Sequence, residues 1–60
     1  MKKNLIEIGA TVEFKAGKDL VNMGVVAEKG VYQASLTVAN DIGGHDTVKV
    51  PYKDVLGFIS

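Results

Sequence analysis

The sequence contains no cysteine, no tryptophan and no arginine, and it is poor in serine and histidine. Without cysteine, neither disulfide bonds nor thiolate metal ligands can support the fold, so a small hydrophobic core or self-association must stabilise it. Without arginine, the bidentate guanidinium contacts with phosphate or with base edges are excluded. Catalysis by a Cys–His pair is excluded as well, because it needs a thiol beside an imidazole.

Residues that could form a catalytic site are few. His45 is the only histidine, and Ser35 and Ser60 are the only serines. Ser35 falls inside a strand pattern and Ser60 is the terminal residue, so neither lies in a turn typical of a nucleophile. Asp41 and Asp46 could form a carboxylate pair, but a chain of 60 residues lacks the deep apolar cleft that would give the two different roles. We therefore expect no enzymatic activity and no cofactor.

Potential metal ligands gather in the stretch DIGGHD, which contains Asp41, His45 and Asp46. A tight zinc site needs three or four nitrogen or sulfur ligands, and the spacing here is not that of a calcium loop. Asparagine, aspartate and paired glycines are also the residues that build turns. We expect a turn in this stretch and no bound metal.

The length and the N-terminus indicate a single small domain over residues 1–60, with 1–8 as a less ordered N-terminal segment. Two lysines near the start precede an apolar stretch that is too short for a signal peptide. No apolar run approaches the ~20 residues needed to cross a bilayer. We expect a soluble, cytoplasmic protein that does not enter a membrane.

Alternation of apolar and polar residues predicts five short strands, over 10–15, 23–29, 31–38, 47–50 and 56–60. The side chains expected to face the core are Val12, Phe14, Tyr32, Ala34, Leu36, Val38, Val48 and Val50. The many valines favour sheet over helix, because β-branched side chains suit a pleated surface.

The segments between these strands predict how the chain turns. Lys29 and Gly30 are expected to form a tight hairpin turn in which the glycine adopts a positive φ. Pro51 should end the fourth strand, since proline cannot donate to a sheet ladder, and PYKDV suits one 3₁₀ turn. Five short strands with a 3₁₀ turn before the last predict an all-β fold, a five-stranded SH3-like small barrel.

The stretch GATVEFKAGKDLVNMGVVAEK (9–29) resembles a KOW motif, the strand–loop–strand element of SH3-like barrels in ribosomal proteins and transcription elongation factors. The matching positions are Gly9, Val12, Phe14, Gly17, Lys18, Asp19, Gly24 and Val26. The resemblance implies an SH3-like fold and RNA or ribosome association. The loop departs from the basic pattern of RNA-binding members, because it reads Leu20-Val21-Asn22-Met23.

The whole chain is also similar to the YkvS-like family of short bacterial proteins, whose domain has no assigned function. The matching stretches are VEFKAG, SLTVAND and TVKVPYKDV. This similarity implies no catalytic residues.

A nucleic-acid interface is one alternative for function. Lys15, Lys49 and Lys53 could surround Tyr52 on one face, giving a stacking ring flanked by positive charge. The net charge of zero and the absence of arginine weigh against this hypothesis. The opposing interpretation makes Lys15 and Lys49 outward strand positions and gives Tyr52 a role in capping the core.

A protein interface is the other alternative. Leu20, Val21 and Met23 lie in or beside a loop where polar residues are usual, and they are expected to cover one end of the barrel. If they are exposed instead, they could form a homodimer contact. Pairing through an exposed strand at 31–38 is a second route to a dimer. We expect a non-catalytic binding module for an unidentified macromolecule, with protein favoured over RNA.

Overall fold

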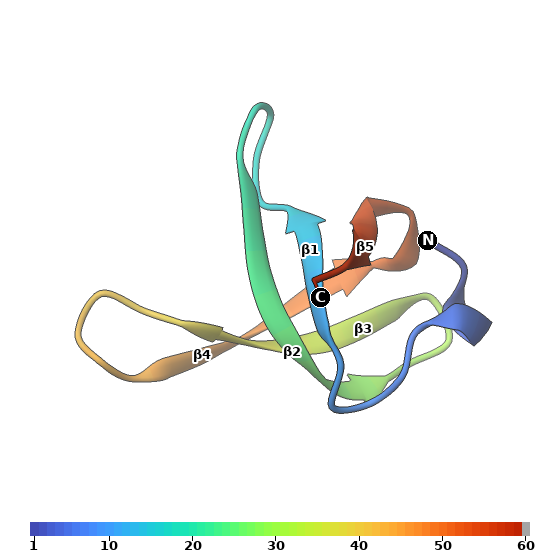
Figure 1. Ribbon diagram of the computed structural model, residues 1–60, viewed down its shortest axis with the longest axis horizontal. Coiled ribbons are helices and arrows are strands. Elements are labelled where there is room, and N and C mark those ends of the chain that lie inside the picture. Colours follow the sequence, from blue (N-terminus) through green and yellow to red (C-terminus); the bar gives the residue numbers. More distant parts are fainter. Residues whose placement is uncertain (60) are drawn as a thin grey trace.

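The computed structural model describes residues 1–59 as one antiparallel sheet with two 3₁₀ turns (Figure 1). The strands are β1 (Thr11–Lys15), β2 (Val21–Lys29), β3 (Gln33–Ala39), β4 (His45–Pro51) and β5 (Val55–Phe58), and the turns are η1 (Lys3–Leu5) and η2 (Tyr52–Asp54). The strand order is β4-β3-β2-β1-β5. The structure confirms the predicted all-β class, the five strands and the 3₁₀ turn before the last strand.

The sheet is open, so the closure of the predicted barrel is not observed. Within residues 1–59, β4 and β5 are the two edge strands and are joined through η2 without pairing to each other. The β1–β2 hairpin runs steeply across the β3–β4 hairpin (Figure 1). Ala27 lies at an irregularity in the β2–β3 register, between Val26 and Glu28, and such bulges increase local twist.

The core lies on one face of this twisted sheet. Its buried hydrophobic residues are Ile6, Val12, Phe14, Val26, Ala34, Leu36, Val38, Val50, Tyr52 and Val55. Val48 is half-buried and packs against this cluster. The predicted inward positions in β1, β3 and β4 are therefore confirmed, because the two-residue period of a strand places alternate side chains on one face.

Tyr32 and Gly30 correct the prediction for the β2–β3 turn. Tyr32 was expected on the core face, but it is 85% exposed because β3 begins only at Gln33. Gly30 does not adopt the expected positive φ, which among residues 1–59 is confined to Gly9 and Gly43. Position 30 has little room for a larger residue, because a Cβ there would lie 3.0 Å from the carbonyl oxygen of Gln33.

The N-terminal segment, which the sequence pattern leaves outside the sheet, packs against the core. Ile6 is only 1% exposed. The amino group of Met1 donates hydrogen bonds of 2.8 Å to the carbonyl oxygens of Tyr52 and Val55. These contacts join residues 1–8 to the chain around η2.

Candidate functional site

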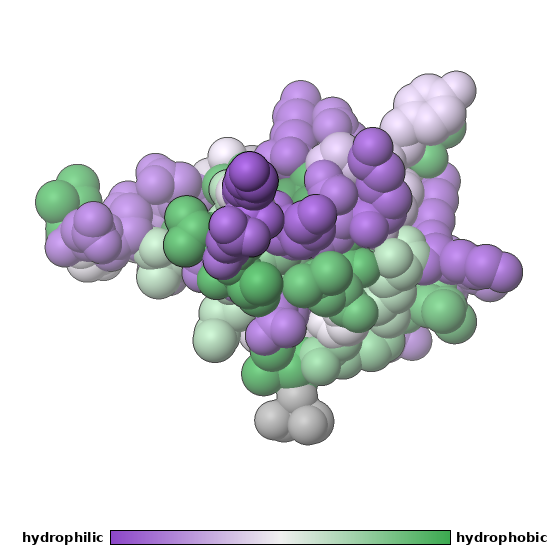
Figure 2. Space-filling model, turned by 90° about the horizontal axis from the view of Figure 1, so that it is seen from above, coloured by the Kyte–Doolittle hydropathy of each residue, from purple (hydrophilic) through white to green (hydrophobic). Residues whose placement is uncertain are grey.

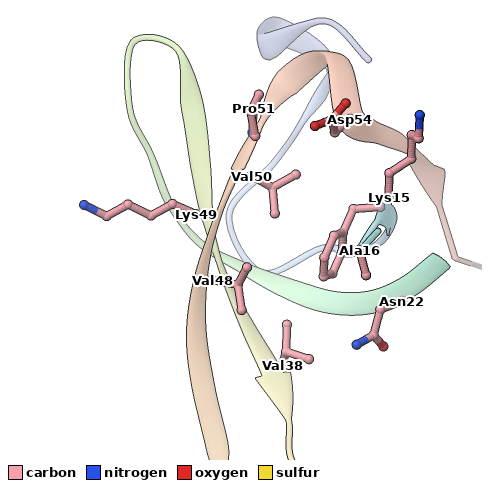
Figure 3. A pocket seen from close by; sticks show the side chains of 10 residues that line it. Lys15, Ala16, Asn22, Val38, Val48, Lys49, Val50, Pro51 and Asp54 are labelled. Carbon is pink, nitrogen blue, oxygen red and sulfur yellow. The ribbon is translucent and has the colours of Figure 1, made fainter. Parts of the chain in front are cut away.

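A shallow groove of about 370 Å³ opens between β1, β4 and η2 (Figure 3). Its lining residues are Phe14, Lys15, Ala16, Asn22, Val38, Val48, Lys49, Val50, Pro51 and Asp54. The volume falls within the range of small-molecule pockets. The apolar side chains at the bottom of the groove are hardly accessible, however, because Phe14, Val38 and Val50 are at most 7% exposed. A ligand in this groove would meet mainly the rim.

The lysines at the rim of the groove do not converge. The side chain of Lys49 points away from the groove, whereas Lys15 lies on the opposite side with Asp54 (Figure 3). Alternation along β4 explains this arrangement, since Val48 and Val50 occupy the inward positions on either side of Lys49. The groove therefore offers no concentrated positive charge.

Tyr52 cannot act as the exposed stacking ring that the nucleic-acid hypothesis requires. Its side chain is buried in the core, and its hydroxyl donates a hydrogen bond to the carbonyl oxygen of Gly30. Lys53 is exposed on the neighbouring position of η2. The four residues Lys15, Lys49, Tyr52 and Lys53 thus do not form a ring flanked by charge, and Tyr52 has the capping role that the opposing interpretation assigned to it.

The outward face of β2 and the residue before it expose several large apolar side chains. Leu20, Val21 and Met23 are between 53% and 67% exposed, so the expectation that they cover the end of a barrel is wrong. Val25, which the sequence interpretation did not single out, continues the row at 41% exposure. We call these four residues the outward β2 face. Figure 2, seen from the side of the β1–β2 loop, shows a band of hydrophobic side chains beside a hydrophilic group.

Strand pairing explains why these side chains stay outside. β2 begins at Val21, which lies opposite Lys15, and Met23 lies opposite Glu13. Gly24 and Val26 are buried, so the odd-numbered residues from 21 to 25 lie on the face away from the core. The sequence pattern predicts this strand from Met23. If the predicted strand began at Val21, its alternation would place Val21, Met23 and Val25 on one face.

The 31–38 segment cannot serve as the edge for dimer pairing. β3 is an interior strand that pairs with β2 on one side and β4 on the other. Its backbone groups are therefore already engaged in the sheet, and this second route to a dimer is wrong.

The β3–β4 loop is built as a turn around Asn40. Its Oδ1 accepts hydrogen bonds from the backbone N–H of Ile42 (3.2 Å) and Gly44 (2.9 Å), and its Nδ2 donates to Asp46 Oδ1 (3.3 Å). Asp41 and His45 are exposed. Among residues 1–59, no three histidine, aspartate or glutamate side chains are grouped to hold a metal ion. Over the same residues, no helix has the length and apolar character to span a membrane.

Comparisons with models of known protein families, with curated proteins and with solved structures find no match. The resemblance to KOW motifs and to the YkvS-like family therefore stays a prediction from the residues. Inferences about function rest on the surfaces of the molecule itself.

Proposed function

We propose that this chain is a non-catalytic, cytoplasmic protein-interaction module and that the outward β2 face is its contact surface. The observation that carries the proposal is the row of Val21, Met23 and Val25, which stay 41–55% exposed on a strand whose other face is in the core, with Leu20, 67% exposed, directly before the strand. Contiguous exposed apolar surface on a small protein is typical of an interaction site. The floor of the groove exposes much less apolar surface to a partner, because Phe14, Val38 and Val50 are at most 7% exposed.

The partner that we propose is a second copy of the chain. Lys15 and Glu13 flank the apolar row on the neighbouring strand, opposite Val21 and Met23. If two copies stack face to face around a two-fold axis at the level of Asn22, each Lys15 comes opposite the Glu13 of the other copy. Two charge pairs would then border an apolar centre, so the surface is compatible with itself in both charge and hydrophobicity.

The expected affinity is weak. Full burial of an aliphatic side chain contributes about 1.5–3 kcal/mol, so four half-exposed side chains in each of two copies offer roughly 8 kcal/mol. The loss of translational and rotational freedom costs about 4–15 kcal/mol, which removes much of this gain. At the low end of this cost about 4 kcal/mol remains, so we expect a weak dimer with a dissociation constant of about 1 mM.

Sedimentation velocity at protein concentrations from about 10 µM to about 1 mM tests the proposal. The wild-type chain should shift from monomer toward dimer as the concentration approaches about 1 mM, and Val21→Asp should stay monomeric because a charge cannot be buried in the apolar centre. Val31→Asp is the matched control, because Val31 is an exposed valine in the β2–β3 turn. This variant should dimerise like the wild type. A wild-type chain that is monomeric at every concentration, or equal loss in both variants, contradicts the proposal.

A further inference from the structure

Three segments that are distant in sequence meet at one end of the molecule. The amino group of Met1 bonds to the carbonyl oxygen of Tyr52, and the backbone N–H of Tyr52 donates to the carbonyl oxygen of Tyr32 at 3.4 Å. The Tyr52 hydroxyl also donates to Gly30. Figure 1 shows the N-terminal segment, the β2–β3 turn and η2 gathered at the same end.

Positive charge is concentrated at this end, although the chain as a whole is neutral. Residues 1–5, 29–32 and 52–54 contain four of the seven lysines and one acidic residue, Asp54. Three units of net positive charge therefore lie here, and the rest of the chain carries three units of net negative charge. The lysines are Lys2, Lys3, Lys29 and Lys53, and we call them, together with Tyr32, the lysine end. Glu28 in β2 adjoins Lys29 in sequence, and counting it lowers the net positive charge of this end from three units to two.

Tyr32 presents an open aromatic ring at the same end of the molecule. Its side chain is 85% exposed, while its backbone is held by the hydrogen bond from Tyr52. A tyrosine with its ring in solvent offers a flat apolar face to a partner. An exposed ring flanked by cationic side chains is the arrangement that stacks a base while its phosphates meet the lysines.

We propose that the lysine end binds single-stranded nucleic acid without sequence preference, by stacking a base on Tyr32 and placing phosphates against Lys2, Lys3, Lys29 and Lys53. An acidic peptide would use the lysines and leave the ring without a role. Sequence preference is not expected, because stacking on a ring and contacts with phosphate are available to every base. This surface shares only Lys53 with the residues that the sequence pattern suggested for nucleic acid, and it lies away from the β1–β2 loop.

Fluorescence anisotropy with labelled oligothymidylate and oligouridylate tests this inference. At low salt the wild-type chain should bind both with a dissociation constant of about 1–100 µM, and the affinity should fall steeply as salt is raised. Tyr32→Ala should weaken binding by about tenfold or more, and Tyr32→Phe should retain it, because the phenyl ring still stacks. The exposed position of Tyr32 makes these changes compatible with folding, which circular dichroism can check.

Charge reversal at two lysines provides the matched comparison. Lys53→Glu should weaken binding severalfold and flatten the salt dependence, whereas Lys18→Glu, the same change in the β1–β2 loop, should have less effect. Absence of binding to either oligonucleotide at low salt overturns the inference. Equal effects of Lys53→Glu and Lys18→Glu overturn it too, and so does a Tyr32→Ala variant that binds as well as the wild type. Binding to polyglutamate or to vesicles containing phosphatidylserine that exceeds binding to the oligonucleotides would point to another partner and likewise overturn it.

Discussion

The hydroxyl of Tyr52 donates a hydrogen bond of 2.5 Å to the carbonyl oxygen of Gly30, across 22 residues of sequence. The bond joins η2 to the β2–β3 turn, and the ring of Tyr52 fills the core below it. Tyr52 therefore stabilises the fold at the place where the sequence pattern had suggested a stacking residue. The neighbouring turn carries Tyr32, whose ring is free to meet a partner.

Replacing Tyr52 with phenylalanine should lower the free energy of unfolding by about 1–2 kcal/mol. The ring stays in the core, but the carbonyl oxygen of Gly30 loses its donor in a partly buried site. Urea denaturation measures the change. Tyr32→Phe removes the same hydroxyl from an exposed position and should change stability by less than about 0.5 kcal/mol. Equal losses in the two variants would contradict the role of the Tyr52 bond.

Gly24 packs tightly against β3, and alanine at this position should be destabilising. A Cβ there would approach the carbonyl oxygen of Thr37 and Cγ2 of Val38 to 3.0 Å. The strands would have to separate, at a cost of about 1–3 kcal/mol that thermal or urea unfolding can measure. Gly57 in β5 is the control, because a Cβ would meet nothing within 4 Å. A Gly57→Ala variant less stable than Gly24→Ala would show that close packing is not the cause.

Ile6 tests whether the N-terminal segment belongs to the core. Ile6→Ala should lower the free energy of unfolding by about 2–5 kcal/mol, because it leaves a cavity among buried side chains. In a domain of this size such a loss approaches the whole stability, so the midpoint of urea unfolding should fall sharply. Ile8→Ala removes the same atoms from an exposed side chain and should have little effect. A small effect of Ile6→Ala would place residues 1–8 outside the folded unit.

Much of the fold follows from local alternation in the sequence. Val12 and Phe14 in β1, and Leu36 and Val38 in β3, repeat with the period of two that a half-buried strand requires. Pro51 correctly predicts the end of β4, where the 3₁₀ turn begins. These features depend on residues next to one another, so a single sequence is enough to reveal them.

The features that the sequence does not reveal depend on contacts between distant segments. Ile6 is buried because the N-terminal segment reaches η2. No periodic pattern in the sequence predicts that contact. Tyr32 fits the alternation of β3, yet the turn extends through it and turns its ring outward. The exposure of Val21 and Met23 is decided by their pairing with β1, which leaves them on the face away from the core.

Nuclear magnetic resonance on dilution is the most direct measurement of the central claim, that the outward β2 face binds a second copy of the chain. Amide chemical shifts are compared between protein concentrations of about 1 mM and about 20 µM. The account predicts shift changes for residues 11–15 and 21–25, with little change in 29–32 or 40–46. Spectra that do not change with concentration, or changes confined to 40–46, would contradict it.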